Sequence, residues 1–334
     1  MKILLNIITF IFILQAHALL EKISDSDIHL IWSTWKTAHN KEYHSLHEDN
    51  KRKDIFLQNY EKIHHHNHNK AEEDVSLILN DFADLTEEEF RSKVHSHIDI
   101  IEEEEDEHKL NYKLLKLPQT FDWRTKGAVN PPKNQGSCGS CWAFAANAAL
   151  ETLVFKKKGK LYSFSEQNLV DCDKSSGGCG GGSFYTGWSY AKVHGLEENA
   201  NYPYVAKEKT CQYDKSKAIT NLTSGSLKIN AKNNSEKLKA TLLTQPVAVA
   251  LDAATKWFQF YHNGVLKTNL CGTTLNHAVV IVGYTVLNGE EAFIVRNSWG
   301  PSWGDHGYIY ISTNSSYSNG KGTCGILAAP GIPI

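Results

Sequence analysis

Apolar residues recur at helical spacing in the first third of the chain. The first group predicts an amphipathic helix over residues 28–43, and the second predicts a helix from about Glu48 to Asn67. Glu48 and Arg52 are four residues apart and can pair across one turn of the second helix. The groups are Ile28, Ile31, Trp32 and Trp35, then Ile55, Phe56, Tyr60 and Ile63. A helical hairpin of this kind carries little functional information by itself.

A different pattern begins at Ser140, where the chain reads SCWAFAANAALETLVFKKK without Gly or Pro until Gly159. This Ala-rich run predicts a long, mostly buried helix. Lys156–Lys158 suit the negative end of its dipole, and Gly159 is a natural stop. The helix places Cys141 in its first turn.

Two β-rich runs lie near the C-terminus, HAVVIVGY beginning at His277 and EAFIVRN ending at Asn297, with the hairpin signal Asn288-Gly289 between them. A tight turn at 288–289 sets Asn297 opposite Val280, about 10 Å along the strand from His277. For His277 and Asn297 to be neighbours, the register must shift. We therefore predict a longer loop around 285–289, or a bulge.

The start of the chain has the pattern of a secretory signal peptide over residues 1–18. Lys2 precedes an apolar run over residues 3–14, and Ala16-His17-Ala18 offers small residues for cleavage. The run is too short to cross about 30 Å of hydrocarbon, and no later stretch reaches the roughly 18 apolar residues of a span. The sequence thus predicts a lumenal or secreted protein without a membrane span, and it permits disulfides.

Charge divides the chain into two parts. The 334 residues carry a formal net charge of −2, which gives no indication of a nucleic-acid partner. Residues 19–117 hold 13 Lys and Arg against 23 Asp and Glu, a charge of −10, whereas residues 118–334 hold 21 against 14, a charge of +7. The acidic run at 102–107 is typical of a solvated linker. We predict a front segment over residues 19–116 and a second domain over 117–334.

The seven cysteines all follow residue 117, and an odd number in an oxidising compartment leaves at least one without an internal partner. Cys138-Gly-Ser-Cys141 could be a redox pair, but no strand pattern precedes it. A zinc site needs a second close pair, and Cys172 and Cys179 have the wrong spacing. A nucleophile at Cys141 has a mechanism, because helix N-terminal N–H groups favour a thiolate. His277 can then take its proton, and Asn297 can orient the imidazole.

These residues resemble the papain family of cysteine peptidases, within the cathepsin L-like group. The resemblance rests on NQGSCGSCWAF (134–144), LNHAVVIVGY (275–284) and RNSWGPSWGDHGY (296–308), and it extends from the front helices to the C-terminus. Glu48, Arg52, Phe56, Asn59, Ile63 and Asn67 match the propeptide pattern known as ERFNIN. NDFAD (80–84) resembles a second propeptide motif, which usually opens with glycine where Ile78 stands here.

The resemblance implies an α+β fold of two domains, a helical one after Pro118 and a β-barrel-like one containing 246–312, preceded by an inhibitory helical propeptide. Cys141 and His277 would face each other across the cleft between the domains, and the mature chain would begin near Leu117 or Pro118. The absence of a long insertion at the cleft favours an endopeptidase.

The resemblance also implies residue roles. Cys141 is the nucleophile, His277 the general base and acid, and Asn297 the orienting residue. Gln135 donates to the oxyanion, and Trp299 shields the histidine–asparagine hydrogen bond. The implied disulfides are Cys138–Cys179, Cys172–Cys211 and Cys271–Cys324. The substrate-binding residues are Gly181 and Gly182 beside the peptide backbone, and Phe184, Ala250, Leu275 and Ala329 around an apolar pocket for the second residue before the cut.

The remaining expectations concern partners, destination and regulation. We expect protein substrates, no cofactor, no metal and a monomer, with cystatin-like inhibitors as further partners. The destination is the secretory pathway, with the lysosome, a digestive vacuole or the extracellular space as end points. Sequons at Asn221, Asn233 and Asn314 permit glycosylation. The HHHNH cluster at 64–68 is expected to be a solvated surface, because adjacent histidines on a helix point in different directions.

Acid is expected to end latency, because protonation of carboxylates and of the 11 histidines in residues 19–117 weakens attraction to the basic part. The competing function is a catalytically inactive papain-like scaffold. Retention of Gln135, Cys141, His277 and Asn297 argues against it.

Overall fold

The computed structural model describes residues 25–70, 75–94, 96–98 and 116–334. The predicted signal peptide and the acidic run at 102–107 lie outside these residues. The chain forms two compact units: the front unit, Met1–Asn69 with Ile78–Thr86, and the main unit, Lys70–Leu77 with Glu87–Ile334.

The front unit contains the two predicted helices, α2 (Asp25–Ala38) and α3 (Leu46–Asn69). Their contact is aromatic: Trp32 and Trp35 stack with ring centroids 5.3 Å apart, and the Phe56 ring lies 4.9 Å from that of Trp35. α2 ends five residues before the predicted position. Asn40 takes a left-handed φ of 51°, and the Lys41 N–H bonds to the Lys36 carbonyl, which together form a C-terminal helix cap.

The NDFAD segment packs within the front unit against α3. The Asn59 amide donates to the carbonyls of Ala83 and Leu85, both at 2.9 Å, and Arg52 donates to the Asp84 carbonyl at 3.0 Å. Arg52 also pairs with Glu48 at 2.7 Å, as the spacing predicted. Ile78, in the place of the usual glycine, is 40% exposed, so its side chain is accommodated without crowding.

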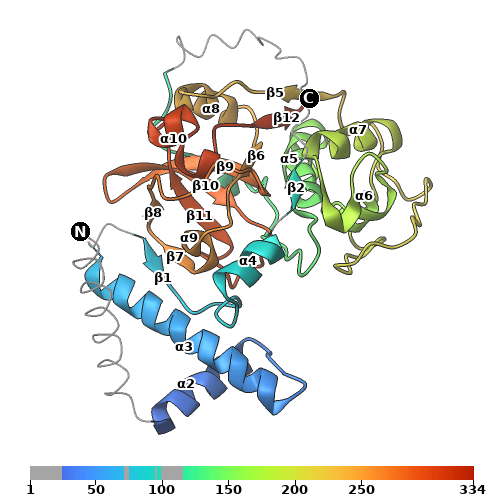
Figure 1. The fold of residues 1–334 in the computed structure, drawn as a ribbon. Helices are drawn as coiled ribbons and strands as arrows, with labels where there is room; N and C mark the ends of the chain where they lie inside the picture. The colour runs from blue at the N-terminus through green and yellow to red at the C-terminus, as the bar shows by residue number, and fades with distance from the viewer. Residues whose placement is uncertain (1–24, 71–74, 95, 99–115) are drawn as a thin grey trace. The chain divides into compact units, whose positions relative to one another are not determined.

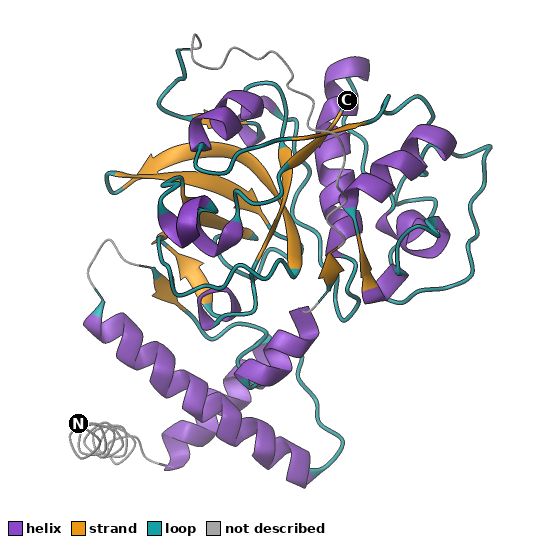
Figure 2. Cartoon of the chain, turned by 45° about the horizontal axis from the view of Figure 1, so that its top comes forward, coloured by secondary structure: helices purple, strands orange, loops and turns teal. Residues whose placement is uncertain are grey.

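The main unit is built on an eight-stranded sheet (Figures 1 and 2). Its pairing is antiparallel except between β11 and β8, and β3 (Phe121–Asp122) also pairs with β9. In β6 and in the first half of β9 every residue is buried, as expected of strands covered on both faces. The order along the sheet is β5 (Ser226–Lys228), β12 (Gly331–Pro333), β6 (Val247–Leu251), β9 (His277–Leu287), β10 (Glu290–Arg296), β11 (Tyr308–Ser312) and β8 (Val265–Leu266).

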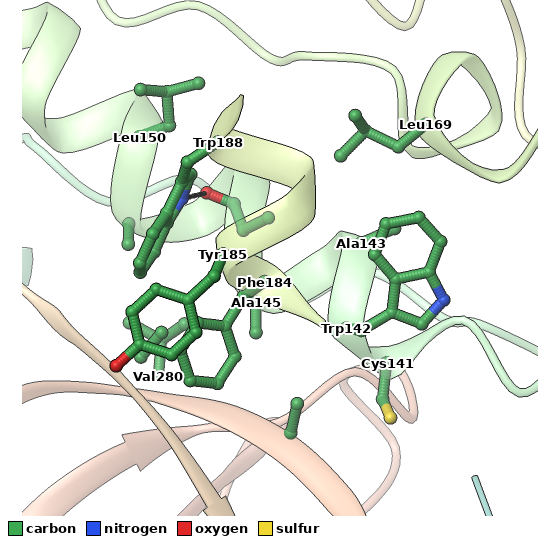
Figure 3. Close-up of a cluster of buried hydrophobic side chains, with 14 of the residues drawn as sticks. Cys141, Trp142, Ala143, Ala145, Leu150, Leu169, Phe184, Tyr185, Trp188 and Val280 are labelled. Carbon is green, nitrogen blue, oxygen red and sulfur yellow. Dashed lines mark hydrogen bonds between the residues drawn. The ribbon is translucent and has the colours of Figure 1, made fainter. Parts of the chain in front are cut away.

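Three helices gather beside this sheet in the main unit: α5 (Cys141–Lys158), α6 (Glu166–Cys172) and α7 (Phe184–His194) (Figure 1). α5 has the predicted bounds, and Gly159 ends it with a φ of 71°. Alanines on α5 allow close packing, and the Trp188 indole donates to the Ala146 carbonyl at 2.9 Å. Figure 3 shows the resulting cluster, in which Phe184, Tyr185 and Trp188 lie against α5. A helical part and a β part are therefore both present, as predicted.

Shorter elements complete the main unit. They are α4 (Glu87–Val94), α8 (Ser235–Leu242), α9 (Lys256–Gln259) and α10 (Tyr317–Gly320), with the two-stranded ladders β1 (Ser76–Leu77) with β7 (Tyr261–Asn263) and β2 (His97–Ile98) with β4 (Gly181–Gly182). Among the described residues, short 3₁₀ helices span Arg124–Lys126, Gly178–Gly180 and Thr323–Gly325. The disulfides are Cys138–Cys179, Cys172–Cys211 and Cys271–Cys324, the pairing that the resemblance implied.

Neither a membrane helix nor a metal cluster is found within the described residues. None of their helices is long and apolar enough to cross a bilayer. No three His, Cys, Asp or Glu side chains of those ranges converge on a point that could hold a metal ion. In the HHHNH cluster, the exposed His64 and His68 rings stack with centroids 6.3 Å apart.

Candidate active site

Cys141 is the first residue of α5 and the one free cysteine of the seven, and its side chain is completely buried. The disulfide at Cys138 and the Gly139 N–H, which donates to the Cys179 carbonyl at 3.0 Å, fix the approach to the helix. Figure 3 shows the sulfur directed away from the Trp142 ring. Because Cys138 is bonded to Cys179, the redox-pair alternative does not apply.

His277 begins β9, and its Nε2 lies 2.8 Å from Oδ1 of Asn297, the residue that follows β10. The Ser298 N–H also donates to that oxygen at 2.8 Å, which fixes the amide orientation. The other imidazole nitrogen, Nδ1, is buried and has no hydrogen-bond partner. The histidine is therefore held at one nitrogen, and its second nitrogen is available for proton transfer.

The register of β9 and β10 explains how this pair meets. The turn at Asn288–Gly289 is tight, so the predicted longer loop is absent; Glu290 pairs with Leu287 and Ile294 with Gly283. A bulge between Ile294 and Val295 then shifts the pairing by one residue. Continued to Asn297, the shifted register places it opposite Val279 instead of Val280.

The bulge decides which face of the sheet Asn297 uses. Side chains two residues apart on a strand share a face, so residue 279 points to the same side as His277, and residue 280 does not. One inserted residue therefore brings Asn297 onto the face of His277, and the side chains span the remaining offset along the strand. The predicted bulge is confirmed, although its shift is smaller than full alignment of the two residues requires.

Gln135 is joined to the same segment. Its N–H donates to the Ser298 carbonyl at 2.8 Å, and the Ser298 hydroxyl donates to its Oε1 at 2.6 Å. With Oε1 occupied, the side-chain Nε2 is turned toward the start of α5, where it donates to the Cys138 carbonyl at 3.0 Å. Ser298, which directly follows Asn297, thus connects Gln135 to Asn297.

Trp299 covers the imidazole. Its ring stacks on that of His277 with centroids 4.7 Å apart and an angle of 29° between the planes. Phe90 of α4 contacts the Trp299 ring edge-on at 5.7 Å. The indole thus excludes water from one side of the imidazole.

Burial dominates the electrostatics of both reactive groups. It raises the pKa of the Cys141 thiol, although the Ala278 N–H, the Ser96 hydroxyl and the N–H groups of the first helical turn favour the anion. It also lowers the pKa of His277 to about 4, against the opposing effect of the Asn297 hydrogen bond. In this covered form, burial therefore opposes ionisation of both side chains, whereas the N–H donors at the start of α5 favour the thiolate.

The residues predicted to bind substrate fall into two sets. Gly181 and Gly182 form β4 and pair in parallel with His97 and Ile98. A Cβ on Gly181 would lie 2.3 Å from the His97 carbonyl oxygen, so only glycine permits this approach. The apolar residues Phe184, Ala250 and Ala329 belong to one hydrophobic cluster, in which Ile98 is buried, and the partly buried Leu275 packs against it.

Residues 87–98, which we call the covering segment, were not identified as part of the site from the sequence. Phe90 contacts Trp299, the Ser96 N–H donates to the Asn276 carbonyl at 3.2 Å, and the Ser96 hydroxyl lies beside the Cys141 thiol. The apolar residues Phe90, Val94 and Ile98 recur every four positions and are the only sequence signal for a buried face. The covering segment therefore packs beside the Cys141 thiol.

A free thiol at a helix start, an imidazole fixed by an amide, and a glutamine donor on a two-part fold define a thiol hydrolase of the cysteine peptidase class, here covered by its own upstream segment. A family model described as papain family cysteine protease matches residues 117–334, and one described as cathepsin propeptide inhibitor domain (I29) matches residues 32–90. The chain belongs to the papain family of cysteine proteases and is a zymogen that carries its own propeptide inhibitor.

Individual relatives agree with this assignment. The chain is 41% identical to vignain of Phaseolus vulgaris over 320 residues, which cover 93% of this chain and 86% of that protein. It is 38% identical to a cathepsin L-like peptidase of Aedes aegypti over 340 residues, covering 97% and 98%. Among solved structures, digestive procathepsin L 3 of the Tenebrio molitor larval midgut superposes with a TM-score of 0.81 at 35% identity, covering 92% and 98%.

Proposed function

We propose that Cys141, His277, Asn297 and Gln135 carry the peptidase activity. The observation that supports this most strongly is the single free thiol with the Ala278 N–H against it, while the preceding His277 is held by Asn297 at 2.8 Å. His277 therefore directly precedes Ala278, the residue whose backbone N–H faces the sulfur of Cys141. A structural cysteine needs no such neighbours.

The chemistry follows from these positions once the site is uncovered. The thiolate of Cys141 attacks the scissile carbonyl carbon, and the Gln135 amide and the Cys141 N–H stabilise the oxyanion. His277 gives its proton to the leaving amine as the C–N bond breaks, which leaves a thioester. Water then attacks the thioester, His277 accepts its proton, and the carboxylic acid and the thiol are released. Asn297 holds the imidazole at Nε2 throughout.

The roles are tested on the processed protein with Cys141→Ala, His277→Ala, Asn297→Ala and Gln135→Ala. Loss of an oxyanion donor typically costs about 3–4 kcal/mol in kcat, so Gln135→Ala should lower kcat by a few hundredfold. Cys141→Ala and His277→Ala should abolish turnover. Full activity in Cys141→Ala would overturn the proposal.

For the substrate, we infer a preference for hydrophobic residues two positions before the cut. Phe184, Ala250, Leu275 and Ala329 offer no charged group, and the buried Ile98 belongs to the same apolar cluster, which supports this preference. A peptide-library profile should favour Leu, Val, Ile and Phe over Arg and Glu at that position. Equal cleavage of peptides with charged residues two positions before the cut would contradict this.

For activation, we infer that acid uncovers the site. The opposite charges of the front and rear parts, −10 and +7, attract near neutrality and less as carboxylates and histidines gain protons. Cleavage near residues 100–117 then gives a mature chain beginning near Leu117 or Pro118. Equal processing rates of the purified precursor at pH 7 and pH 4 would contradict this account.

For destination and partners, we infer entry into the secretory pathway, ending in a lysosome, a digestive vacuole or outside the cell. The mature enzyme is expected to be a monomer that cystatin-like proteins inhibit at the same cleft. Asn221, Asn233 and Asn314 are exposed, so each sequon is accessible to glycosylation. Mass spectrometry of the secreted protein before and after glycosidase treatment tests the three sites.

A further inference from the structure

The HHHNH cluster near the end of α3 contains two histidines that the peptidase mechanism does not use. His64 and His68 are four residues apart within α3, and both side chains are exposed. Their rings stack with centroids 6.3 Å apart and an angle of 10° between the planes. We call these two residues the histidine pair.

The helix places the histidine pair on one face. Residues four apart on an α-helix lie one above the other, whereas neighbours along the chain diverge by about 100°. The Tyr60 ring, four residues before His64, extends the same row, with its centroid 6.0 Å from that of His64. Divergence of adjacent histidines, which favoured a simple solvated surface, therefore does not hold for residues four apart.

Two imidazoles one helical turn apart can act as a bidentate ligand for a metal ion. Metal–nitrogen bonds are about 2.0–2.1 Å long, so two nitrogens on one ion lie at most about 4 Å apart. The nearly parallel rings of the histidine pair reach this separation by rotation about their side-chain bonds, because both are exposed. Within the residues that the structure describes, neither imidazole makes a hydrogen bond or an ion pair that would have to break.

The donor atoms select the kind of ion. Neutral imidazole nitrogens suit Cu²⁺, Ni²⁺ and Zn²⁺, whereas Mg²⁺ and Ca²⁺ prefer oxygen ligands. Among these ions, Cu²⁺ binds a given nitrogen site most tightly. Across the described ranges, no third His, Cys, Asp or Glu joins the histidine pair in a group that could hold a metal ion, so water would complete the coordination.

The same spacing occurs in the His-Glu-x-x-His motif of zinc peptidases, in which two helical histidines hold the ion and the glutamate is the general base. In this chain the position of that glutamate is His65, so the base is missing. The histidine pair is therefore suited to binding an ion and not to a second hydrolytic reaction.

A bound ion would stabilise the helix that carries it. The bidentate arrangement exists only while residues 64–68 are helical, so the free energy of binding adds to that of folding. α3 lies in the part of the chain that matches the propeptide inhibitor domain, residues 32–90, and Asn59 of the same helix holds the NDFAD segment. Occupation of the site would thus stabilise the folded propeptide.

We propose that His64 and His68 form a binding site for one divalent transition-metal ion, with Cu²⁺ preferred, and that occupation of this site stabilises α3 and with it the latent form. The site lies wholly within the front unit. The proposal is independent of the catalytic roles given above.

The test uses the Cys141→Ala precursor without a histidine tag, because this variant lacks the free thiol as a competing ligand. Cu²⁺, Zn²⁺ and Mg²⁺ are titrated separately by calorimetry at pH 7.5, and one Cu²⁺ should bind more tightly than Zn²⁺, with no binding of Mg²⁺. His64→Ala and His68→Ala should each weaken Cu²⁺ binding about a hundredfold, because the second imidazole binds intramolecularly. His65→Ala, at an exposed position of the same cluster, is the matched control and should bind like the parent.

Hydrogen exchange measures the effect on the helix. At a free Cu²⁺ concentration about a hundred times the dissociation constant, amides of residues 60–69 should exchange up to about a hundredfold more slowly, because opening must release the ion. Exchange in α5 should not change, and a chelator should reverse the effect. Undiminished binding in His64→Ala and His68→Ala, or an equal loss in His65→Ala, overturns the site. Binding that leaves exchange in α3 unchanged overturns the stabilisation of the latent form.

Discussion

The two units of the chain are stabilised by different kinds of interaction. In the front unit, carboxylates anchor the contacts beside the aromatic stack: Asp49 accepts from Lys36 and Trp32, and Asp84 accepts from Lys41 and Tyr43. The main unit depends on buried apolar strands and three disulfides. Acid neutralises carboxylates but leaves apolar packing and disulfides unchanged, so these contacts of the front unit weaken once their carboxylates are protonated.

The pKa shifts refine this comparison. Burial alone would raise the pKa of Asp49, but Lys36 and Trp32 lower it below 3.8, so its contribution to stability is lost only as the pH falls below that value. His277 has a pKa of about 4 when covered and an ordinary value of 6.5, so the covered state loses stability throughout that interval. As the pH falls, stability is therefore lost first at the covered site of the main unit, and the contribution of Asp49 is lost only at lower pH.

The largest expected effect concerns the single free thiol of the main unit. Cys141→Ala should lower peptidase activity by at least about 10⁴-fold, because the nucleophile is lost and cannot be replaced by neighbouring groups. The three disulfides and the folding of both units should be unchanged, as judged by thiol counting and circular dichroism. Cys138→Ala serves as contrast, since it releases Cys179 and should reduce thermal stability. Retained turnover in Cys141→Ala would show that the reactive group lies elsewhere.

The second prediction tests which unit responds first to acid. In the Cys141→Ala precursor, uncovering of the site should become easier by up to about 3 kcal/mol between pH 6.5 and pH 4, because His277 gains a proton only when uncovered. Hydrogen exchange of the covering segment measures this free energy. His277→Gln cannot gain the proton and should show a nearly flat dependence over the same interval. An equally steep dependence in that variant would assign the response to the front unit.

The third prediction concerns the front unit. Asn59→Ala removes two buried hydrogen bonds at 2.9 Å and leaves the Ala83 and Leu85 carbonyls without that donor, which should cost about 2–4 kcal/mol. Asn69→Ala, at an exposed position of the same helix, is the matched control. Hydrogen exchange of α3 should speed up strongly in the first variant and little in the second, while the main unit should not change. Equal effects would show that helix propensity, and not the buried amide, determines the loss.

Local patterns predicted part of this molecule well. The bounds of α5 followed from its Ala-rich run and Gly159, and the His277–Asn297 contact followed from two strands and a register argument. For the pairing of β9 with β10, the sequence predicted only a longer loop or a bulge, because the position of a bulge depends on how neighbouring strands pack. The early end of α2 depends on Asn40 adopting a left-handed conformation, for which its sequence neighbours give only a weak signal.

The pKa of the Cys141 thiol could not be predicted from local sequence patterns. Its raised pKa results from burial among segments far apart in the sequence, including the covering segment some 50 residues upstream. The role of Ser298, which connects Gln135 to Asn297, likewise requires a contact across more than 160 residues. Residue types and spacing were enough to propose the reactive groups, whereas their protonation depends on tertiary contacts.

The smallest expected effect concerns an exposed ion pair of the main unit. Arg91 and Glu87 of α4 form an ion pair at 3.1 Å, but their side chains are 60% and 58% exposed. Glu87→Gln should therefore change the free energy of unfolding by at most about 0.5 kcal/mol, because water screens an exposed pair. Thermal unfolding of the Cys141→Ala precursor should shift by no more than about 2 °C, and 1 M salt should remove even that difference. A loss as large as that of Asn59→Ala would mean that an exposed ion pair contributes as much stability as the Asn59 amide hydrogen bonds.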